Sequence, residues 1–225
     1  MADTEAAIHH ASPIFVQIFQ GPVMDNARAR ELYDQWAGTI APGADGWLGS
    51  TAGVTDEGEF IAVVRFASGE SARRSNERAE QAEWWQSMKE QFVGDVTFHD
   101  CTSIAEFGGG AWAHAGFVQI VQGWATDLRD VMELRFVDIE DHYTRSRHLQ
   151  MAAGLVCDHA DGGGFSEVIY FPSEKEARDP DSQELYREGV ASLETLAQHV
   201  TNLRYLTLRD PWTSTGAGAG TRRFG

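Results

Sequence analysis

The sequence predicts an α+β fold in which two tandem βαββαβ repeats pack their sheets face to face within one chain. Three observations lead to this prediction. The segment FVQIFQG at 15–21 recurs as FVQIVQG at 117–123, with six of seven positions identical. Further matches follow in the same order: VRFAS at 64–68, for example, corresponds to IYFPS at 169–173. Each first strand is also apolar on both alternating faces, which is typical of a strand buried on both sides.

The first repeat should contain, in order, a strand, a helix, a hairpin, a second helix and a last strand. These elements are expected at residues 13–21, 24–40, 47–66, 68–92 and 95–101. Apolar residues recur at helical spacing in both helices. Asp25 or Asn26, and Ser68 or Ser71, are of the types that cap helix N-termini. The DEG segment at 56–58 is suited to turn the hairpin.

The second repeat has the same order of elements, expected at residues 115–123, 126–143, 151–171, 182–200 and 202–210. The repeats are therefore placed at 12–106 and 116–212, with a flexible Gly-rich linker at 107–115 and a disordered tail at 213–225. A βαββαβ unit of ferredoxin-like topology carries both helices on one face of its sheet, which leaves the other apolar face uncovered. Two such sheets cover one another, which explains why the first strand occurs twice.

Composition bears on partners and location. Acidic residues outnumber basic ones by 34 to 18, and the formal net charge is −16. Nucleic acids and anionic membranes are bound through Lys and Arg, so neither is an expected partner. No apolar run approaches the roughly 18 residues of a membrane span, and no secretion signal begins the chain, so a cytoplasmic protein is expected. Cys101 and Cys157 fit buried thiols in a reducing compartment. A monomer, as a pseudo-dimer, or a weak homodimer is expected.

Parts of the chain resemble a known protein family. Three segments carry the resemblance: GWLGSTAGVTDEGEFIAVVRF, RFASGESARRSNERAEQAEWWQSMKEQFVGDVTFHDCTSI and, near the end, LRDPW. They are similar to the dimeric α/β-barrel superfamily, and within it to the antibiotic biosynthesis monooxygenase type, in a tandem-repeat form of actinobacterial type. The resemblance covers residues 14 to about 212 and implies an intramolecular dimeric α/β-barrel. The superfamily includes cofactor-independent quinone-forming monooxygenases, haem-degrading proteins and small isomerases.

Polar residues at barrel-facing positions are candidate ligand contacts, because their burial costs free energy unless they are paired. Gln17 and Gln119 occupy equivalent positions on the first strands and are candidate substrate-binding residues, although each could instead bond its counterpart or a backbone edge. Arg65 and Tyr170 are equivalent on the third strands. Arg65 could bind a substrate oxyanion, or it could end its strand in water. Tyr170 is a further candidate for substrate binding.

The second helix of the first repeat offers Asn76 and two adjacent tryptophans. Trp85 joins an apolar stripe with Met88 and is expected to be buried. Trp84 lies about 100° further round the helix, so it is expected to be more exposed and to edge a cleft between helix and sheet. Monooxygenases of the resembled family hold aromatic substrates with Asn, Trp, Tyr and Arg side chains. The resemblance therefore implies Arg65, Asn76 and Trp84 as candidate catalytic residues of a first-repeat cavity.

Neither a metal site nor a cofactor is expected. Haem degradation in the superfamily uses an Asn on the first strand and a His on the second helix, and the first repeat has neither. His99 and Asp100 are neighbours on a strand and therefore point to opposite faces. The DHAD segment at 158–161 could attract a cation, but a hairpin turn also requires Asp and Gly.

Two functions follow as hypotheses. The first, supplied by the resemblance, is a cofactor-independent monooxygenase acting on an aromatic or polyketide-like small molecule. The substrate would provide a stabilised carbanion, and the protein a dry pocket that orients it. The second is a non-catalytic small-molecule-binding or stress-related protein on the same scaffold. An apolar cavity with a few convergent polar groups would favour ligand chemistry.

Overall fold

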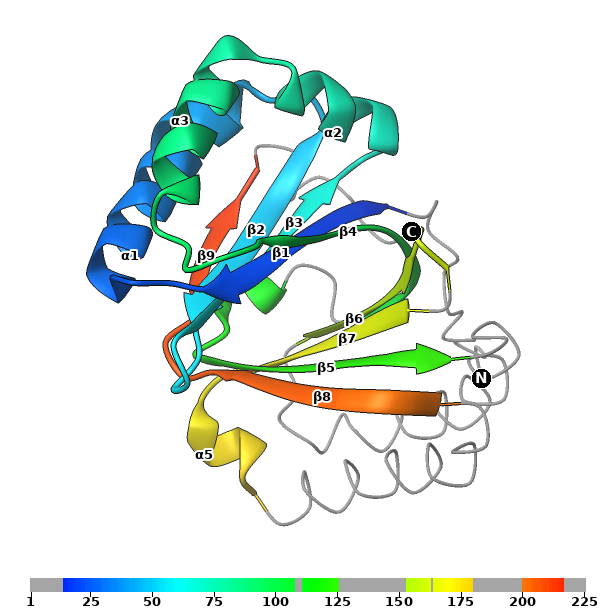
Figure 1. The fold of residues 1–225 in the computed structure, drawn as a ribbon. Helices are drawn as coiled ribbons and strands as arrows, with labels where there is room; N and C mark the ends of the chain where they lie inside the picture. The colour runs from blue at the N-terminus through cyan, green and yellow to red at the C-terminus, as the bar shows by residue number, and fades with distance from the viewer. Residues whose placement is uncertain (1–13, 108–110, 126–152, 163, 180–199, 217–225) are drawn as a thin grey trace, which may run out of the picture.

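The computed structural model of the protein describes residues 14–107, 111–125, 153–162, 164–179 and 200–216. Its strands are β1 Phe15–Pro22, β2 Trp47–Val54, β3 Glu59–Phe66, β4 Thr97–Phe107, β5 Phe117–Ala125, β6 Ala153–His159, β7 Gly164–Phe171, β8 Val200–Leu208 and β9 Trp212–Thr215. They form one curled antiparallel sheet in the order β8-β5-β7-β6-β4-β1-β3-β2-β9 (Figure 1).

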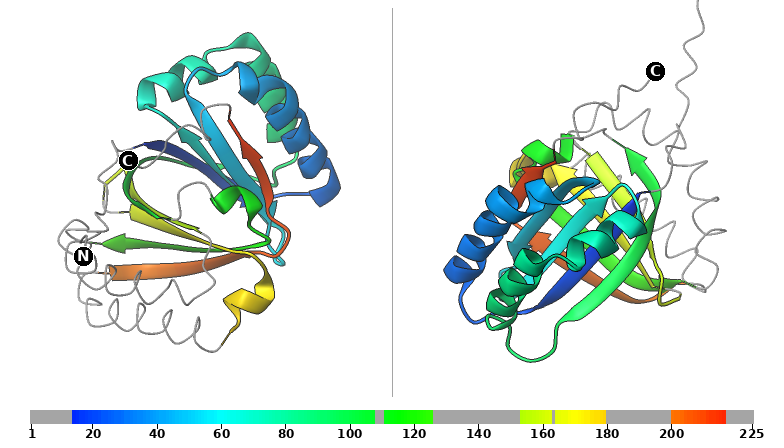
Figure 2. Two further views of the ribbon diagram at one scale, coloured as in Figure 1. Left: turned by 180° about the vertical axis from the view of Figure 1, so that it is seen from behind. Right: turned by 90° about the horizontal axis from the view of Figure 1, so that it is seen from above.

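Three helices cover the outer face of the first-repeat half of this sheet (Figures 1 and 2). The helical elements are α1 Asn26–Gln35, α2 Gly69–Asn76, α3 Ala79–Lys89 and α5 Glu174–Ala177, with short turns η1 Trp36–Ile40, η2 Ala41–Gly43 and η3 Ala111–His114. None of the helices in the described ranges is long and apolar enough to cross a membrane. The two long helices expected in the second repeat, at 126–143 and 182–200, fall almost entirely outside the described residues.

The sheet confirms the predicted tandem repeat. The four first-repeat strands lie in the order β4-β1-β3-β2 and their second-repeat counterparts in the order β8-β5-β7-β6, which is the same arrangement. The repeats are joined where the second half of β4 pairs with β6, from Cys101 opposite His159 to Phe107 opposite Gly154. The sheet ends at β8 and β9, and residues 209–211 connect these two strands directly.

Two expected irregular segments are partly ordered. The predicted tail begins at residue 213, but residues 212–215 form β9 and pair with β2, with Trp212 opposite Ala52. Apolar burial of Trp212 in the first-repeat core favours this strand over a free tail. Within the predicted linker, residues 111–114 form η3, whereas 108–110 lie outside the described residues, as do 217–225. The tail expected from residue 213 therefore begins within β9, whereas the expected linker contains the last residue of β4 and the short turn η3.

Helix α1 forms as its sequence predicts. Asp25 caps it, because its Oδ1 accepts a hydrogen bond of 3.0 Å from the backbone N–H of Arg28. The helix buries Ala29, Leu32 and Tyr33 against the sheet. It continues into the π turn η1, which brings Trp36 into the same buried layer.

The second helix differs from the prediction of one continuous helix. Ser68 caps α2 as expected, but the helix ends at Asn76, and Arg78 has an extended backbone with ψ of 139° before α3 begins. Within α3, Trp84 and Met88 are four residues apart and share the buried face, whereas Trp85 is only partly buried and Ala82 is exposed. The expected order of burial for the two tryptophans was therefore wrong, because the buried face of α3 is the one that carries Trp84 and not the one that carries Ala82 and Trp85.

Alternate residues of the central strands face two different layers. On β1, Val16 and Ile18 point inward, whereas Phe15 and Phe19 point outward beneath the helices. We call the inward layer the inner cluster; it comprises Ile14, Val16, Ile18, Ile61, Val63, Cys101, Ala115, Val118, Ile120, Ala153, Leu155, Cys157, Val168, Tyr170, Leu206 and Leu208. Because both repeats contribute to it, the inner cluster confirms that the sheets cover one another.

Candidate functional site

The candidate site is a pocket of about 280 Å³ between the outer face of the first-repeat sheet and its helices. Its floor is provided by outward residues of β1 and β3 and its roof by α1, α2 and α3. It is lined by Gln17, Phe19, Tyr33, Trp36, Phe60, Ala62, Val64, Phe66, Ser75, Asn76, Gln81, Ala82, Trp84, Trp85, Gln86 and Phe98. This volume is close to the lower end of small-ligand sites, which hold roughly 300–1,000 Å³.

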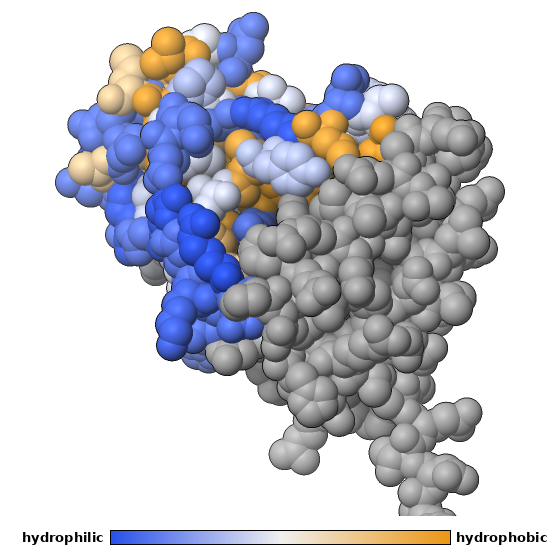
Figure 3. Space-filling model, turned by 90° about the horizontal axis from the view of Figure 1, so that it is seen from below, coloured by the Kyte–Doolittle hydropathy of each residue, from blue (hydrophilic) through white to orange (hydrophobic). Residues whose placement is uncertain are grey.

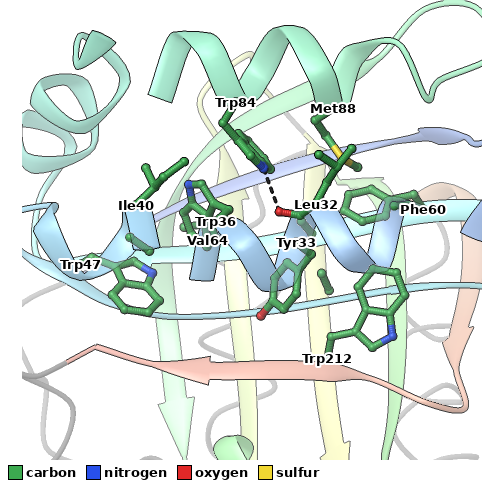
Figure 4. Close-up of a cluster of buried hydrophobic side chains, with 14 of the residues drawn as sticks. Leu32, Tyr33, Trp36, Ile40, Trp47, Phe60, Val64, Trp84, Met88 and Trp212 are labelled. Atoms are coloured by element: carbon green, nitrogen blue, oxygen red, sulfur yellow. Dashed lines mark hydrogen bonds between the residues drawn. The ribbon is translucent and has the colours of Figure 1, made fainter. Parts of the chain in front are cut away.

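Aromatic rings form most of the pocket wall, and hydrogen bonds hold two of them in place. The indole N–H of Trp84 donates to the carbonyl of Leu32 at 2.8 Å, which ties α3 to α1 (Figure 4). The indole N–H of Trp36 donates to Gln81 Oε1 at 2.7 Å. Rings anchored at their polar edge have little freedom to swing into the pocket. The wall is therefore largely pre-formed.

A second group of lining rings lies around Phe98, where the pocket opens to the surface; we call this opening the mouth. Phe19 meets Trp85 edge to face with centroids 5.5 Å apart, and Trp85 meets Phe98 in the same way at 5.2 Å. Phe98 is 53% exposed, which is unusual for so large an apolar side chain. On the face of the molecule drawn in Figure 3, hydrophilic side chains cover much of the described surface and several groups of hydrophobic side chains lie among them. An exposed ring beside a ring-lined pocket is a natural first contact for a flat apolar ligand.

Two polar side chains of the pocket lining, Asn76 and Gln17, form a chain of hydrogen bonds that ends at Asp100 outside the lining. Asn76 Nδ2 donates to Gln17 Oε1 at 3.3 Å, and Gln17 Nε2 donates to Asp100 Oδ1 at 3.0 Å. The carboxylate can only accept, so it fixes which end of the Gln17 amide faces Asn76. Asn76 is thereby oriented, and its other N–H and its carbonyl oxygen have no hydrogen-bond partner among the described residues.

The pocket itself is electrically neutral. Its lining residues include no Asp, Glu, Lys, Arg or His. The Tyr33 hydroxyl, which lies within hydrogen-bonding distance of Ser50 Oγ and Ser214 Oγ at 3.0 and 3.1 Å, remains protonated because burial raises its pKa. Recognition in such a pocket depends on ring contacts and amide hydrogen bonds.

Three of the six site residues predicted from sequence line this pocket: Gln17, Asn76 and Trp84. Arg65 does not join them, because it points to the opposite face of β3. It is 4% exposed, donates to the Tyr170 hydroxyl and lies 4.4 Å from the centre of the Trp112 ring. The expected cleft edged by Arg65, Asn76 and Trp84 is therefore not formed, and Arg65 does not end its strand in water either.

The equivalent pair Arg65 and Tyr170 meets across the interface between the repeats. Tyr170 belongs to the inner cluster, where its ring also lies 5.3 Å from the guanidinium carbon of Arg65. Thr51 Oγ1 accepts a further, longer hydrogen bond from Arg65 at 3.4 Å. These contacts satisfy a buried cation by hydrogen bonds and ring faces. The pair holds the two sheets together rather than facing the pocket.

Gln17 and Gln119 were expected either to bind substrate or to bond their counterparts, and they make no hydrogen bond to one another. Gln17 faces the pocket and Gln119 is its equivalent on β5, with an Oε1 atom that has no hydrogen-bond partner among the described residues. The glutamines that bond their counterparts are Gln20 and Gln122, through hydrogen bonds of 2.8 and 3.1 Å. Gln20 is three positions after Gln17, so the two side chains lie on opposite faces of the strand.

Several wall residues were not proposed from sequence. Outward positions of β3 and the helix faces above them contribute most of these rings. Apolar residues alternate along β3 at Phe60, Ala62, Val64 and Phe66, and this pattern could have identified them as wall residues. What it does not show is that the rings leave a space between them.

A second cluster of side chains lies on the inward face. His99 and His159 stack with centroids 4.0 Å apart, and Asp161 Oδ2 lies 3.5 Å from His99 Nδ1. Burial, together with the neighbouring His99, lowers the pKa of His159 to about 4. Deeper in the same layer, burial raises the pKa of the Cys157 thiol, so it remains protonated. The histidine cluster was not expected from sequence spacing, since its members come from different repeats.

Comparison with known proteins places the fold. No family model and no curated protein sequence matches the chain. Solved structures with very different sequences do match. A Fusobacterium nucleatum protein provisionally named a monooxygenase has a TM-score of 0.70, with 6% identity, over 92% of this chain and 96% of its own. An anthrone oxidase-like protein has a TM-score of 0.64, with 11% identity, over 92% of this chain and 94% of its own.

A third matching structure is described as having the ferredoxin fold. An uncharacterised ferredoxin-fold protein from Listeria monocytogenes, related to antibiotic biosynthesis monooxygenases, has a TM-score of 0.52 and 9% identity. It matches over 88% of this chain and 96% of its own. Each match spans both repeats, so the tandem arrangement itself is shared. At these identities the likeness establishes the fold, which is the tandem ferredoxin-like barrel that the sequence predicts.

Proposed function

We propose that this protein is a cofactor-independent monooxygenase that binds a neutral, flat aromatic molecule of the anthrone or hydroquinone class in the first-repeat pocket. The observation that carries the proposal is the pocket lining: rings on several sides, side-chain amides near the mouth, and no charged side chain. Such a lining favours an uncharged aromatic ligand over a sugar, a phosphate or an amino acid. Similarity in fold to an anthrone oxidase-like protein supports the same substrate class.

The reaction needs little from the protein besides a suitable environment. An anthrone loses a proton from its methylene carbon to give a carbanion conjugated with the ring oxygen. Electron transfer to O₂ and recombination form a carbon–oxygen bond, and loss of water from the resulting hydroperoxide leaves a carbonyl. One oxygen atom enters the quinone and the other leaves as water. The reducing electrons come from the substrate itself.

The pocket residues would act on this sequence by orientation and charge stabilisation. Asn76, held by Gln17 and through it by Asp100, has an N–H available for the oxygen on which negative charge develops. The aromatic wall excludes water, which strengthens that hydrogen bond. No basic side chain lines the pocket, so a solvent water molecule or hydroxide ion at its opening near Phe98 would accept the released proton.

The test is oxygen uptake by purified, chelator-treated protein supplied with an anthrone, followed together with quinone absorbance. Uptake and quinone formation in equal amounts are expected. Asn76→Ala should lower turnover about tenfold, because a hydrogen bond near solvent is worth about 1.5 kcal/mol. Gln91→Ala is the matched control, since it removes an amide at the end of the α3 region that does not line the pocket. Equal turnover in the two variants would contradict the role given to Asn76.

A second candidate function is ligand binding without catalysis, and the same neutral lining favours it. No side chain of the pocket can serve as a general base at neutral pH. A binder should show a raised unfolding temperature with aromatic ligands but no oxygen uptake. If a panel of anthrones and hydroquinones produces neither uptake nor stabilisation, both functions are contradicted.

A further inference from the structure

The inward end of the barrel, away from the pocket, holds a group of side chains that metal ions prefer. His99 lies on β4 of the first repeat, whereas His159 ends β6 and Asp161 follows in the turn before β7. One ring nitrogen from each histidine and one carboxylate oxygen all lie within 4.8 Å of one another. We propose that His99, His159 and Asp161 form a binding site for a first-row divalent metal ion such as Zn²⁺, which joins the two repeats.

The backbone brings these three residues together by strand pairing. Cys101 on β4 lies opposite His159 on β6, and the N–H of Ala160 donates to the carbonyl of Asp100 at 2.7 Å. The turn that follows is tight: the N–H of Gly162 donates to the carbonyl of His159 at 3.2 Å, and Gly162 has a φ of +92°. This turn folds Asp161 back over the histidines. A left-handed residue at this point explains the glycine.

His99 lacks any other partner for the nitrogen that faces the site. Its Nδ1 atom is buried and makes no hydrogen bond within the part of the chain that the structure describes. A buried polar atom without a partner costs about 1–3 kcal/mol. A metal ion would use this lone pair. Asp161 Oδ2, at 3.5 Å, is too distant for a hydrogen bond but close enough to share a metal.

The second histidine is held as metal-ligating histidines usually are, with one nitrogen bonded away from the site. His159 Nε2 lies 2.9 Å from Ser166 Oγ, which also accepts from Gln122 Nε2 at 3.2 Å. Gln122 is in turn paired with Gln20. This buried chain of hydrogen bonds fixes the ring and leaves His159 Nδ1 for the metal. Gly164 keeps side-chain atoms away from Nδ1, because a Cβ there would lie 2.6 Å from it.

The ligand set indicates the class of metal. Two imidazole nitrogens and one carboxylate suit borderline divalent ions such as Zn²⁺, Co²⁺ and Ni²⁺ better than Mg²⁺ or Ca²⁺. Tetrahedral zinc with bonds of about 2.0–2.1 Å places its ligand atoms about 3.3 Å apart. Closure around an ion requires two movements: Asp161, whose side chain is 51% exposed and lies on a turn, moves inward, and His99 turns out of its stack with His159 so that both lone pairs reach the ion. Three protein ligands leave a fourth position for water.

The site is separate from the pocket. His99 points inward, whereas its neighbours Phe98 and Asp100 face the pocket side of β4. Its effect would be structural: a metal bound to both repeats stabilises the folded chain in proportion to its concentration above the dissociation constant. The proposal does not depend on the monooxygenase function, and each can fail without the other.

The experiment is calorimetric titration of chelator-treated protein with Zn²⁺, together with thermal unfolding at each metal concentration. Asp161→Asn should weaken the tightest binding step at least about tenfold, and His99→Gln about 100-fold. Both should reduce the rise in unfolding temperature that a given concentration of Zn²⁺ gives the unaltered protein, His99→Gln more than Asp161→Asn. The matched controls are Asp158→Asn, from the same segment, and His114→Ala, an exposed histidine elsewhere; both should behave as the unaltered protein.

Cobalt provides a readout of geometry, since Co²⁺ in a tetrahedral nitrogen and oxygen site has a strong visible absorption. That band should appear with one equivalent of Co²⁺ and be lost in Asp161→Asn. Because Asp161 is exposed, its variant should unfold at the same temperature as the original protein when no metal is present. Unchanged zinc affinity in both Asp161→Asn and His99→Gln would overturn the proposal.

Discussion

Strand β3 separates two regions that are packed in different ways. Its outward residues Phe60 and Phe66 belong to an aromatic layer that leaves a pocket of about 280 Å³. Its inward residues Ile61 and Val63 belong to the inner cluster, which is composed mostly of aliphatic side chains from both repeats. Neighbouring residues of one strand therefore contribute to a site and to a core.

The difference follows from the shapes of the side chains. β-Branched and other aliphatic residues interdigitate between two sheets and fill the space between them. Rings held at an angle to one another, as Trp84 and Trp36 are at 37°, meet along edges and leave gaps. The inward glutamines Gln20 and Gln122 are paired with one another, whereas Asn76 on the outward side has hydrogen-bonding groups without a partner among the described residues. Ligand chemistry is thus expected outward and structural contacts inward.

Among the variants that compare the outward and inward regions, Trp84→Ala is expected to have the largest effect on stability. Trp84 is 7% exposed and ties α3 to α1 through its bond to Leu32, so its removal should cost about 3–5 kcal/mol in the free energy of unfolding. Trp85→Ala should cost less, because Trp85 is only partly buried, but it should weaken aromatic ligand binding. Urea unfolding of both variants measures the difference. Equal losses would mean that the two tryptophans share one environment.

Arg65→Ala tests the inward region. Its removal leaves the Tyr170 hydroxyl without its donor and opens a space beside Trp112, so a loss of about 2–4 kcal/mol is expected. Arg65→Met should retain more of the stability, because a similar volume stays filled. Oxygen uptake per folded molecule should be unchanged in both. A fall in turnover without a fall in stability would place Arg65 in the chemistry after all.

The smallest effect on stability is expected from Gln17→Ala, which compares equivalent positions in the two repeats. Loss of its two hydrogen bonds at a partly exposed position should cost about 1 kcal/mol or less. Ligand affinity should nevertheless fall several-fold, because Asn76 is no longer oriented. Gln119→Ala is the matched change on β5. A similar loss of affinity in that variant would show that the second repeat also binds the ligand.

Much of the fold could be predicted from local sequence. Alternation along 15–21 and its recurrence at 117–123 determined the strands, their two buried faces and the tandem arrangement. The caps Asp25 and Ser68 were identifiable because a side-chain oxygen before a helical pattern satisfies free backbone N–H groups. These signals act over a few residues, and periodicity or hydrogen-bonding chemistry is enough to interpret them.

The site depended on distances that the chain order does not contain. Packing between segments far apart in sequence decides three features: the face that Arg65 occupies, the orientation of α3 after the break at Arg78, and the place where β4 meets β6. The sequence by itself therefore determined which residues alternate and which repeat. Only the tertiary structure decided that Asn76 meets Gln17 and that His99 meets His159, because each of these contacts joins strands or helices whose relative position is set by the whole sheet.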